Sequence, residues 1–339
     1  MELVRLGIIG CGAISKKHGE AISRIEDAKL VAAADLVEEN VRRFVDNYGG
    51  KPYTDYREML EDPDVDAVII VTPSGLHANM AQDALDAGKH VLVEKPLAMS
   101  ADDADSLIKK AQEVKRTLQT VHPNRYYETS EMTHKAIKEG RFGKLSHGVA
   151  TVRWNRTQEY YDEAPWRKTR EMDGGVLLNQ AWHALDLLLW FMGPVARVQG
   201  MTSKRLHDVE TEDIALVTLE FESGALGLVE ATTNVYPRNL EQTVSIFGEK
   251  GTAVLGGSRI DAIRVWRVKG DKDESEVLGV WSEDTAPKHN PSWAHERVIR
   301  YFINHLKSGI IVAPEVHTAA MAIKVIESVV GSSSETSCQ

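Results

Sequence analysis

Hydrophobic and polar residues follow two different patterns along this chain of 339 residues. From residue 3 to about residue 121, short apolar runs alternate with longer segments in which apolar residues recur every three or four positions. Short strands alternating with amphipathic helices are typical of a parallel sheet that helices cover on both faces. This part of the chain is therefore predicted to be an α/β domain with a doubly wound parallel sheet.

Several strands and helices are expected in this first domain. The strands are 4–9, 29–35, 67–72, 90–93 and 118–121, and the helices are 13–24, 37–48, 78–87 and 101–115. Sheets of this kind bind ligands just beyond the carboxyl ends of their strands. Polar residues that follow these strands are therefore candidates for a functional site.

Beyond about residue 144 the pattern changes to β-rich runs with short polar turns. Strands are expected at 145–154, 195–203, 214–221, 225–233, 242–247, 252–255 and 263–268. The polar segments 222–224 and 249–251 each contain a glycine and are typical of hairpin turns, which make a large, mostly antiparallel open sheet. One early helix, 176–191, interrupts the strands, so this part is predicted to be α+β.

Two further helices, 292–306 and 314–330, are expected to return to the first domain or to cap the second sheet. The predicted domains are residues 1–122 and residues 123–331. The ending is rich in serine, so residues 332–339 are expected to form a flexible tail.

Composition narrows the class of protein. Hydrophobic residues make up 42% of the chain and charged residues 27%, as in ordinary globular proteins. The formal net charge of −10 argues against a nucleic acid or an anionic membrane as partner. No apolar run is long enough to span a bilayer, no cleavable leader precedes the first strand, and two cysteines cannot form a disulfide framework. These features predict a cytoplasmic protein.

The first chemical motif is Gly10-Cys11-Gly12-Ala13-Ile14-Ser15, which lies between an apolar run and a helical segment. A glycine at position 10 permits the tight strand-to-helix turn, and one at position 12 leaves room for a pyrophosphate beside the N–H groups of the helix start. Ser15 stands where a third glycine is usual. The motif predicts a dinucleotide site that includes Gly10, Gly12, Ala13 and Ile14; the alternative is a glycine turn in an unrelated α/β fold.

Asp35 ends the next apolar run. In dinucleotide sites an acidic residue follows the glycines at a distance of roughly 20 residues. A carboxylate there accepts hydrogen bonds from a ribose 2′-hydroxyl and repels a 2′-phosphate. The cofactor is therefore expected to be NAD rather than NADP.

Two further motifs follow predicted strands, Thr72-Pro73-Ser74 and Glu94-Lys95-Pro96. A lysine that is partly desolvated beside a nicotinamide has its pKa lowered toward neutrality and can take a proton. Lys95 is therefore a candidate catalytic residue, and while charged it could instead bind a substrate hydroxyl. The alternative is a surface lysine in a turn.

On the predicted helix 176–191, the polar or aromatic residues Asn179, His183, Asp186 and Trp190 fall along one stripe of an otherwise apolar surface. A polar stripe on a buried helix needs a reason. We interpret it as the wall of a site, with His183 as proton acceptor and Asn179 positioning the substrate or the imidazole. Glycines at positions 174 and 175 let a ligand approach the helix start. The alternative is a hydrogen-bonded core histidine.

The segment 153–170 concentrates basic and aromatic residues. They are Arg153, Trp154, Arg156, Tyr160, Tyr161, Trp166, Arg167, Lys168 and Arg170. In an acidic protein this segment predicts an anionic substrate, because arginine pairs bidentately with carboxylate or phosphate and aromatic rings stack on a base or a sugar. The alternative is a set of internal salt bridges with the acidic residues of the same segment. The sequence contains no metal-binding motif of the His-Glu-x-x-His or Cys-x-x-Cys type.

Taken together, these residues resemble the glucose–fructose oxidoreductase, inositol dehydrogenase and rhizopine-catabolism family, written Gfo/Idh/MocA. The matching positions are Gly10-Cys11-Gly12, Asp35, Thr72-Pro73-Ser74-Gly75-Leu76-His77, Glu94-Lys95-Pro96, Asn124-Arg125-Tyr126, and Gly174-Gly175 followed by His183 and Asp186. The resemblance implies a Rossmann domain and hydride transfer between a bound nicotinamide and a sugar or polyol hydroxyl. It also implies a homo-oligomer, a dimer or tetramer, formed through the open sheet of the C-terminal domain.

The resemblance further implies roles for individual residues. Lys95, His183 and Asn179 fall on the catalytic positions. The implied cofactor-binding set adds Thr72, Pro73, Ser74, His77, Glu94, Lys95 and Asn124 to the glycine turn and Asp35. The implied substrate-binding set is Lys95, Arg125, Arg153, Arg156, Tyr160, Arg167, Asn179 and His183, and no metal is implied.

Residues 153–161 and 164–167 are similar to a narrower branch of the family. These are the dehydrogenases that oxidise the 3-hydroxyl of UDP-N-acetylglucosaminuronate on the way to surface-polysaccharide sugars. Many family members carry an aspartate where this chain has Asn179, as that branch is expected to have. A neutral amide cannot stabilise an imidazolium as a carboxylate can, so proton acceptance moves toward Lys95.

The predicted function is therefore NAD-dependent oxidation of a small anionic substrate, a nucleotide-linked uronic acid. Two alternatives stay open at this point. One is a related enzyme that acts on a free polyol or a simple sugar and needs no clustered arginines. The other belongs to a different class, a Rossmann-type protein that binds NAD as a regulator without turnover.

Overall fold

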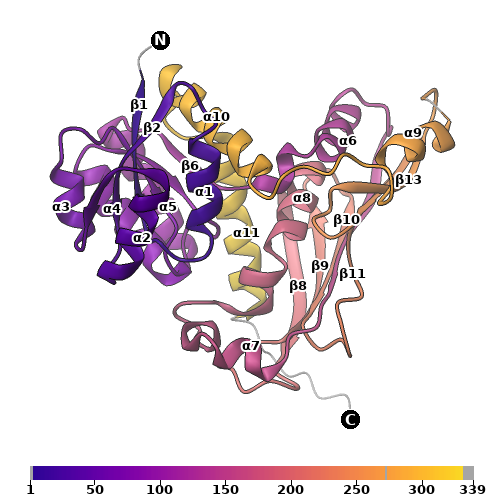
Figure 1. Ribbon diagram of the computed structural model, residues 1–339. Helices are drawn as coiled ribbons and strands as arrows, with labels where there is room; N and C mark the ends of the chain where they lie inside the picture. Colours follow the sequence, from indigo (N-terminus) through magenta and orange to yellow (C-terminus); the bar gives the residue numbers. More distant parts are fainter. Residues whose placement is uncertain (1–2, 272, 331–339) are drawn as a thin grey trace. The chain divides into compact units, whose positions relative to one another are not determined.

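The computed structural model describes residues 3–271 and 273–330, which form two compact units (Figure 1). The first unit comprises the described chain up to Pro123 together with His289–Ala320. The second unit comprises Asn124–Lys288 together with the described residues from Met321 onward. The helix predicted at 292–306 therefore belongs to the first unit. The predicted tail, 332–339, lies outside the described residues.

The first unit is built on a six-stranded parallel sheet with the strand order β3-β2-β1-β4-β5-β6. The strands are β1 (Val4–Ile9), β2 (Ala28–Ala34), β3 (Lys51–Tyr53), β4 (Ala67–Ile70), β5 (His90–Val93) and β6 (Leu118–Thr120). All residues of β4 are buried, which explains its continuous apolar run. The predicted fold class is confirmed, and the short strand β3 is an element that the sequence pattern did not predict.

Helices connect these strands. They are α1 (Ser15–Ile22), α2 (Glu38–Tyr48), α3 (Tyr56–Glu61), α4 (His77–Asp86) and α5 (Ala101–Val114), followed much later in the chain by α10 (Trp293–Lys307). The helix α1 packs against both α2 and α10, and α4 packs against α5. An ion pair between Lys307 and Asp27, at 2.6 Å, also ties the end of α10 to this unit.

The second unit is built on a seven-stranded sheet with the order β13-β12-β11-β7-β10-β9-β8. The strands are β7 (Leu145–Arg153), β8 (Val195–Ser203), β9 (Ile214–Phe221), β10 (Leu226–Thr232), β11 (Glu241–Gly248), β12 (Gly251–Gly256) and β13 (Ala262–Val268). Neighbouring strands are antiparallel except for β7 and β10, which are parallel. The predicted, mostly antiparallel sheet is confirmed, and so are the hairpins β9–β10 and β11–β12.

Helices pack on one face of this sheet. The helix α8 (Trp182–Met192) lies against β7 and β11, and α6 (Glu128–Lys138) lies against α8. The unit also contains α7 (Gln158–Asp162), α9 (Glu274–Trp281) and most of α11 (Pro314–Val330). The sequence pattern did not predict α6, α7 or α9. No helix among the described residues is long and apolar enough to cross a membrane.

The predicted helix 176–191 is not continuous. A single π-helical turn, Val176–Gln180, comes first, and α8 begins only at Trp182. The wide turn changes the angular step between positions 179 and 183, so the spacing of a regular α-helix does not apply across this junction. The polar stripe predicted from regular spacing is therefore divided, and its two halves have different surroundings.

Candidate active site

The glycine turn joins β1 to α1. Gly10 has a φ of 96°, and a Cβ atom there would come within 3.0 Å of the backbone of Val71, so glycine is required. Gly12 is exposed, and a Cβ there would meet no atom within 4 Å. Ser15 is buried, and its hydroxyl donates a hydrogen bond to the carbonyl oxygen of Gly12 at 2.6 Å. The turn therefore combines open space with the N–H groups of a helix start, which is what a pyrophosphate requires.

Asp35 follows β2 and lies beside this turn. Its Oδ2 accepts a hydrogen bond from the N–H of Cys11 at 2.7 Å, and its Oδ1 accepts one from the N–H of Val37 at 2.9 Å. Burial, helped by the charge of Asp35, raises the pKa of Cys11 to about 12, so this thiol stays protonated. The hydrogen bonds fix a half-buried carboxylate where it can accept hydroxyl hydrogen bonds and repel a phosphate.

Lys95 lies in the loop after β5, and the backbone on both sides of it is held. The Oε2 atom of Glu94 accepts the backbone N–H of Lys95 at 3.2 Å. The imidazole of His77 lies 2.7 Å from the carbonyl oxygen of Pro96 and 2.9 Å from that of Thr72, so it links the loops after β4 and β5. The two strand-end motifs thus fix the backbone from which Lys95 projects.

Glu94 is buried in a cluster that the sequence analysis did not find. The Nε2 atoms of His18 and His295 lie 2.8 Å and 3.7 Å from the same carboxylate oxygen. Burial opposes the charge of Glu94, but the two histidines hold its pKa well below the usual range. The Nδ1 atoms of both rings have no hydrogen-bond partner within the described chain. Each ring therefore turns its Nε2 toward an ionised Glu94.

The same three side chains have the donor types of a metal site, and their ligand atoms lie within 4.8 Å of one another. Metal ligation needs a histidine nitrogen without a proton. The Nε2 atom of His18 is instead hydrogen-bonded to the carboxylate of Glu94, which accounts for this cluster without a metal. His18 lies on α1 and His295 on α10, so the cluster joins two parts of the first unit that are far apart in the sequence.

The C-terminal half of the predicted stripe consists of Asp186 and Trp190, which lie on α8 in the second unit. Asp186 on α8 forms a buried, bidentate ion pair with Arg125, with N–O distances of 2.9 and 2.5 Å. The guanidinium of Arg125 also lies 5.3 Å from the ring of Trp190, which stacks on His134 at 3.9 Å. These contacts give Asp186 and Trp190 a structural role. A role of Arg125 in substrate binding stays a prediction.

The turn before α8 is built around glycine. Gly175 has a φ of 94°, and a Cβ atom there would collide with the carboxylate of Glu212. Glu212 accepts the N–H of Val176 through its carbonyl oxygen at 3.1 Å and that of Leu177 through Oε1 at 3.2 Å. Burial raises the pKa of Glu212 to about 7, with a smaller contribution from the charge of Asp173. This turn carries the half-buried residues at positions 179 and 183.

Part of the basic segment 153–170 forms a compact cluster around one ring. The guanidinium groups of Arg156 and Arg167 lie 5.0 Å and 4.3 Å from the ring of Tyr160. Gln180 accepts a hydrogen bond from Arg156 at 3.1 Å and donates one to the hydroxyl of Tyr160 at 3.2 Å. We call Arg156, Tyr160 and Arg167 the arginine–tyrosine cluster. Because Gln180 directly follows Asn179, the cluster lies next to the turn that carries the candidate catalytic residues of this unit.

The basic residues of the segment divide into two groups. Arg153, on β7, pairs with Glu230 at 2.6 Å and with Glu241 at 2.7 Å, and Lys168 pairs with Asp162. For these residues the internal salt bridges expected as the alternative are present. Arg156 and Arg167, by contrast, have no ion-pair partner among residues 3–271 and 273–330. The charges of Arg156 and Arg167, like that of Arg170, which donates to the carbonyl oxygen of Glu210 at 3.2 Å, are therefore available to an anionic ligand.

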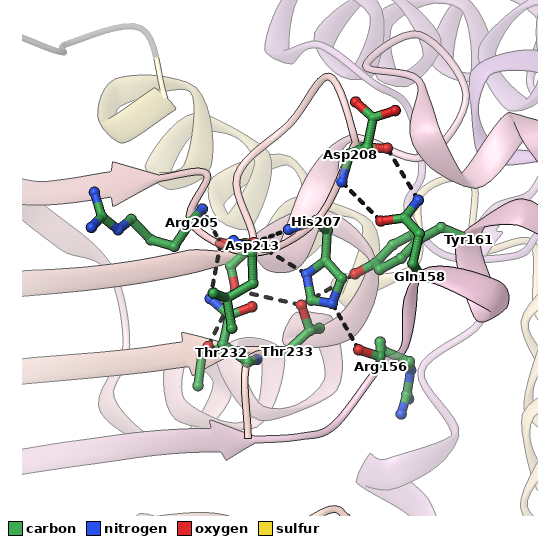
Figure 2. A network of polar contacts seen from close by, with 11 residues as sticks. Arg156, Gln158, Tyr161, Arg205, His207, Asp208, Asp213, Thr232 and Thr233 are labelled. Carbon is green, nitrogen blue, oxygen red and sulfur yellow. Dashed lines mark hydrogen bonds and ion pairs between the residues drawn. The ribbon is translucent and has the colours of Figure 1, made fainter. Parts of the chain in front are cut away.

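A polar network anchors the backbone of this cluster, as Figure 2 shows. The ring of His207 bridges Asp213 and the carbonyl oxygen of Arg156, at 3.1 and 2.7 Å. Burial opposes the charge of Asp213, but hydrogen bonds from Asn234 and from three backbone N–H groups hold its pKa below the usual value. The hydroxyl of Tyr161 donates to Thr233 at 3.1 Å. The loop 204–213 thus fixes the start of the basic segment, a role that the sequence analysis missed.

The structure brings the candidate residues together in two groups. In the first unit, the segments after β1, β2, β4 and β5 carry Gly10, Gly12, Ala13, Ile14, Asp35, Thr72, Pro73, Ser74, Glu94 and Lys95, and His77 begins α4. In the second unit, Arg156, Tyr160 and Arg167 adjoin the turn with Asn179 and His183, whereas Arg125 and Arg153 are engaged in ion pairs. Asn124 donates a hydrogen bond to the carbonyl oxygen of Arg259 at 2.7 Å.

The parallel sheet, the open glycine turn and the fixed Asp35 carboxylate define the class of a dinucleotide-binding oxidoreductase. Residues 4–122 match the family model described as "Oxidoreductase family, NAD-binding Rossmann fold", and residues 131–254 match the "GFO/IDH/MocA C-terminal domain". The chain belongs to the GFO/IDH/MocA family of oxidoreductases. It is an NAD-dependent enzyme of the class that oxidises sugars and polyols, so a purely regulatory NAD-binding protein is excluded.

Relatives agree with this assignment along most of the chain. The WlbA dehydrogenase from Bordetella pertussis, solved in complex with NADH and UDP-GlcNAcA, is 33% identical, with a TM-score of 0.87 over 97% of this chain and 95% of that one. The WlbA enzyme from Chromobacterium violaceum, solved with the same ligands, is 31% identical, with a TM-score of 0.85 over 96% and 92%. Myo-inositol 2-dehydrogenase from Thermotoga maritima is 29% identical over 90% of this chain and 89% of its own length.

Proposed function

We propose that this enzyme oxidises the 3-hydroxyl of UDP-N-acetylglucosaminuronate with NAD, in the biosynthesis of surface-polysaccharide sugars. The observation that carries the proposal is the arginine–tyrosine cluster, in which two guanidinium groups flank one aromatic ring and no carboxylate of the described chain neutralises them. The likeness to two WlbA dehydrogenases that were solved with UDP-GlcNAcA supports it.

The chemistry of the cluster suits a nucleotide-linked uronic acid. Such a molecule carries a diphosphate, a carboxylate and flat or ring-shaped groups. Arg156 and Arg167 can each form hydrogen bonds to a phosphate or a carboxylate, and the ring of Tyr160 holds the two guanidinium groups near each other. In a chain with a net charge of −10, two unpaired arginines side by side mark a place where an anion is stabilised.

The residues of the first unit fit a bound NAD. Gly10, Gly12 and the start of α1 would hold the pyrophosphate, and Asp35 would hold the adenine ribose, which favours NAD over NADP. When bound, NAD accepts the hydride that leaves the sugar carbon. Residues 1–122, together with the returning segment His289–Ala320, then form the cofactor domain, and the remainder of 123–331 forms the substrate and oligomerisation domain.

Proton transfer is assigned to two side chains. Lys95 takes the proton of the sugar hydroxyl, and His183 contributes a hydrogen bond to the substrate. The reason is the amide at position 179, which provides no charge to stabilise a protonated imidazole at position 183. The backbone around Lys95 is fixed by Glu94 and His77, which suits a group that must meet a reacting hydroxyl.

A second candidate substrate is a free polyol or a simple sugar, favoured by the relationship to myo-inositol 2-dehydrogenase. Reduction of NAD should be followed with a panel of UDP-sugars, among them UDP-N-acetylglucosaminuronate and its neutral analogue UDP-N-acetylglucosamine, and with inositols and free hexoses. We expect turnover of UDP-N-acetylglucosaminuronate, which carries both the uridine diphosphate and the carboxylate, and little or none of compounds that lack either group. Faster turnover of an inositol than of every UDP-sugar would replace the proposed substrate with a polyol.

We also propose that a second copy of the chain covers the outer face of the seven-stranded sheet. The face carries exposed apolar side chains on three neighbouring strands. They are Met201 on β8, Leu216 on β9, and Leu226 and Leu228 on β10. Exposed apolar patches of this kind are typical of interfaces. Light scattering should give the mass of a dimer or tetramer for the native chain, and a monomer at micromolar concentration would refute the interface.

A further inference from the structure

Asp173 lies in the turn before α8 and is itself almost completely buried, with 3% of its surface exposed. Its Oδ1 atom accepts a hydrogen bond from the side-chain nitrogen of Asn179, and its Oδ2 atom faces the N–H of Gly175 at 3.4 Å. The N–H groups of Asp173 and of the next residue both point to the carbonyl oxygen of Thr169, at 3.1 and 3.4 Å. A short, closed turn therefore holds this carboxylate against one specific amide.

The partner of Asn179 decides which end of its amide faces the rest of the site. A side-chain amide has a donor end, NH2, and an acceptor end, the carbonyl oxygen, whereas an ionised carboxylate only accepts. With its nitrogen committed to Asp173, Asn179 must turn its carbonyl oxygen away from Asp173. The amide therefore presents an acceptor, which is complementary to an imidazole N–H or to a sugar hydroxyl.

We propose that Asp173 is the positioning residue of the catalytic centre, orienting Asn179 and supplying the buried negative charge that the amide lacks. The proposal rests on the proposed function for the roles of Asn179 and His183. It deepens that function, because the aspartate that many family members carry at position 179 is here divided between two residues. Position 179 provides the hydrogen-bonding group, and position 173 provides the charge.

The groups around Asp173 agree with a charge at this position. Glu212, the other buried carboxyl of this turn, has its pKa raised to about 7, mainly by burial, and the charge of Asp173 adds to the shift. Tyr161 also has its pKa raised, to about 12, mainly by burial and partly by Asp173. The N–H groups at a helix start favour an anion. Arg170 is the basic group whose charge opposes this shift of Glu212.

The test uses three variants of the full chain. Asp173→Asn removes the charge and leaves two amides facing each other. The exchange variant, Asp173→Asn with Asn179→Asp, keeps one amide and one carboxylate at the two positions. Asp64→Asn is the matched control, because this carboxylate has 76% of its side chain exposed on the first unit.

The first measurement is an NMR titration of the imidazole of His183, identified as the signal that is missing in His183→Asn. Removing a nearby negative charge destabilises an imidazolium, so its pKa should fall in Asp173→Asn. It should rise above the native value in the exchange variant, where the charge moves to position 179. The control should not differ from the native chain. This titration needs no turnover, so it decides the role of Asp173 even if no UDP-sugar is oxidised and the proposed function fails.

The second measurement is steady-state kinetics with NAD and UDP-N-acetylglucosaminuronate. Losing a charge-assisted hydrogen bond in the reacting state should lower kcat of Asp173→Asn about ten- to a hundredfold with little change in KM. The exchange variant should recover part of the native kcat. If Asp173→Asn does not fold, the exchange variant alone is compared with the native chain. An unchanged His183 titration and an unchanged kcat, with only a lower unfolding temperature, would reduce Asp173 to a structural residue and overturn the proposal.

Discussion

The two candidate regions of this enzyme are built in different ways. In the first unit, the site consists of loops that follow parallel strands, and its functional groups are largely backbone N–H groups and residues adjacent to them, such as Gly12, Asp35 and Lys95. In the second unit, the site consists of long side chains, Arg156, Tyr160 and Arg167, which come from a loop and two short helical segments. The parallel sheet fixes the site of the first unit, whereas side-chain hydrogen bonds fix the site of the second unit.

This difference corresponds to two tasks. A dinucleotide presents the same pyrophosphate and ribose to every enzyme that binds it, so backbone geometry is sufficient to hold it. A substrate differs from one enzyme of a family to the next, so its recognition depends on side chains that can be exchanged without changing the sheet. Substitutions should therefore separate the two regions, with chemistry lost at Lys95 in the first and affinity lost at the arginine–tyrosine cluster in the second.

The largest effect is expected from Lys95→Met in the first unit. The substitution keeps a similar side-chain length but removes the charge and the group that takes the proton. A positioned acid or base contributes about 10²–10⁴-fold to rate. Stopped-flow hydride transfer should slow by about that factor, while titration calorimetry should show nearly unchanged binding of NAD and the sugar.

Two variants make this result interpretable. Lys109→Met is the matched control, because Lys109 lies on α5 with 77% of its side chain exposed. His183→Asn should keep residual activity, since His183 contributes only a hydrogen bond. If His183→Asn is inactive and Lys95→Met transfers hydride at nearly the native rate, the two roles have been assigned the wrong way round.

A smaller effect, confined to the sugar, is expected in the second unit. Arg156→Ala or Arg167→Ala removes one charge-assisted contact to the anionic substrate, which costs roughly 1.5–3 kcal/mol. KM for the UDP-sugar should rise about ten- to a hundredfold, and the dissociation constant of NAD should not change. Arg57→Ala, on the exposed surface of α3, serves as control. Native affinity of both variants for every substrate that is turned over would make the cluster structural.

The same contrast explains which parts of the molecule could be predicted from sequence. In the first unit the apolar strands are short and continuous, and Gly10 and Asp35 lie at a fixed spacing, so both the sheet and the glycine turn beside Asp35 follow from local pattern. The strand β3, with two of its three residues exposed, has no apolar run to indicate it. The second sheet was predictable because alternating residues and glycine-containing turns are also local signals.

What could not be predicted depends on contacts between distant residues. His18 and His295 reach the same carboxylate from helices that are far apart in the sequence, and His207 reaches the carbonyl oxygen of Arg156 across 51 positions. No spacing rule connects such residues. The π-helical turn was missed because its sequence, Val-Leu-Leu-Asn-Gln, is equally compatible with a regular helix. One usable signal was the pair of acidic residues, Glu212 and Asp213, immediately before an apolar strand.

The smallest effect is expected from Glu212, and it concerns stability rather than catalysis. Its pKa is about 7 in the folded protein because of burial, against about 4.3 in an unfolded chain. A carboxyl whose pKa is raised by folding favours the folded state while it is protonated, so its contribution is lost as the pH rises through 7. Linkage gives a loss of about 1.4 kcal/mol between pH 6 and pH 8.

Glu212→Gln should remove this pH dependence. The amide is close in shape, keeps an acceptor for the N–H of Leu177 and cannot ionise, so the free energy of unfolding in urea should change less between pH 6 and pH 8 than in the native chain. Glu26→Gln, at an exposed position, should keep the native slope. An identical slope in Glu212→Gln and in the native chain would show that Glu212 is already ionised at pH 6. The turn before α8 would then hold two buried carboxylates, and Asp173 would not be the single source of negative charge proposed for it.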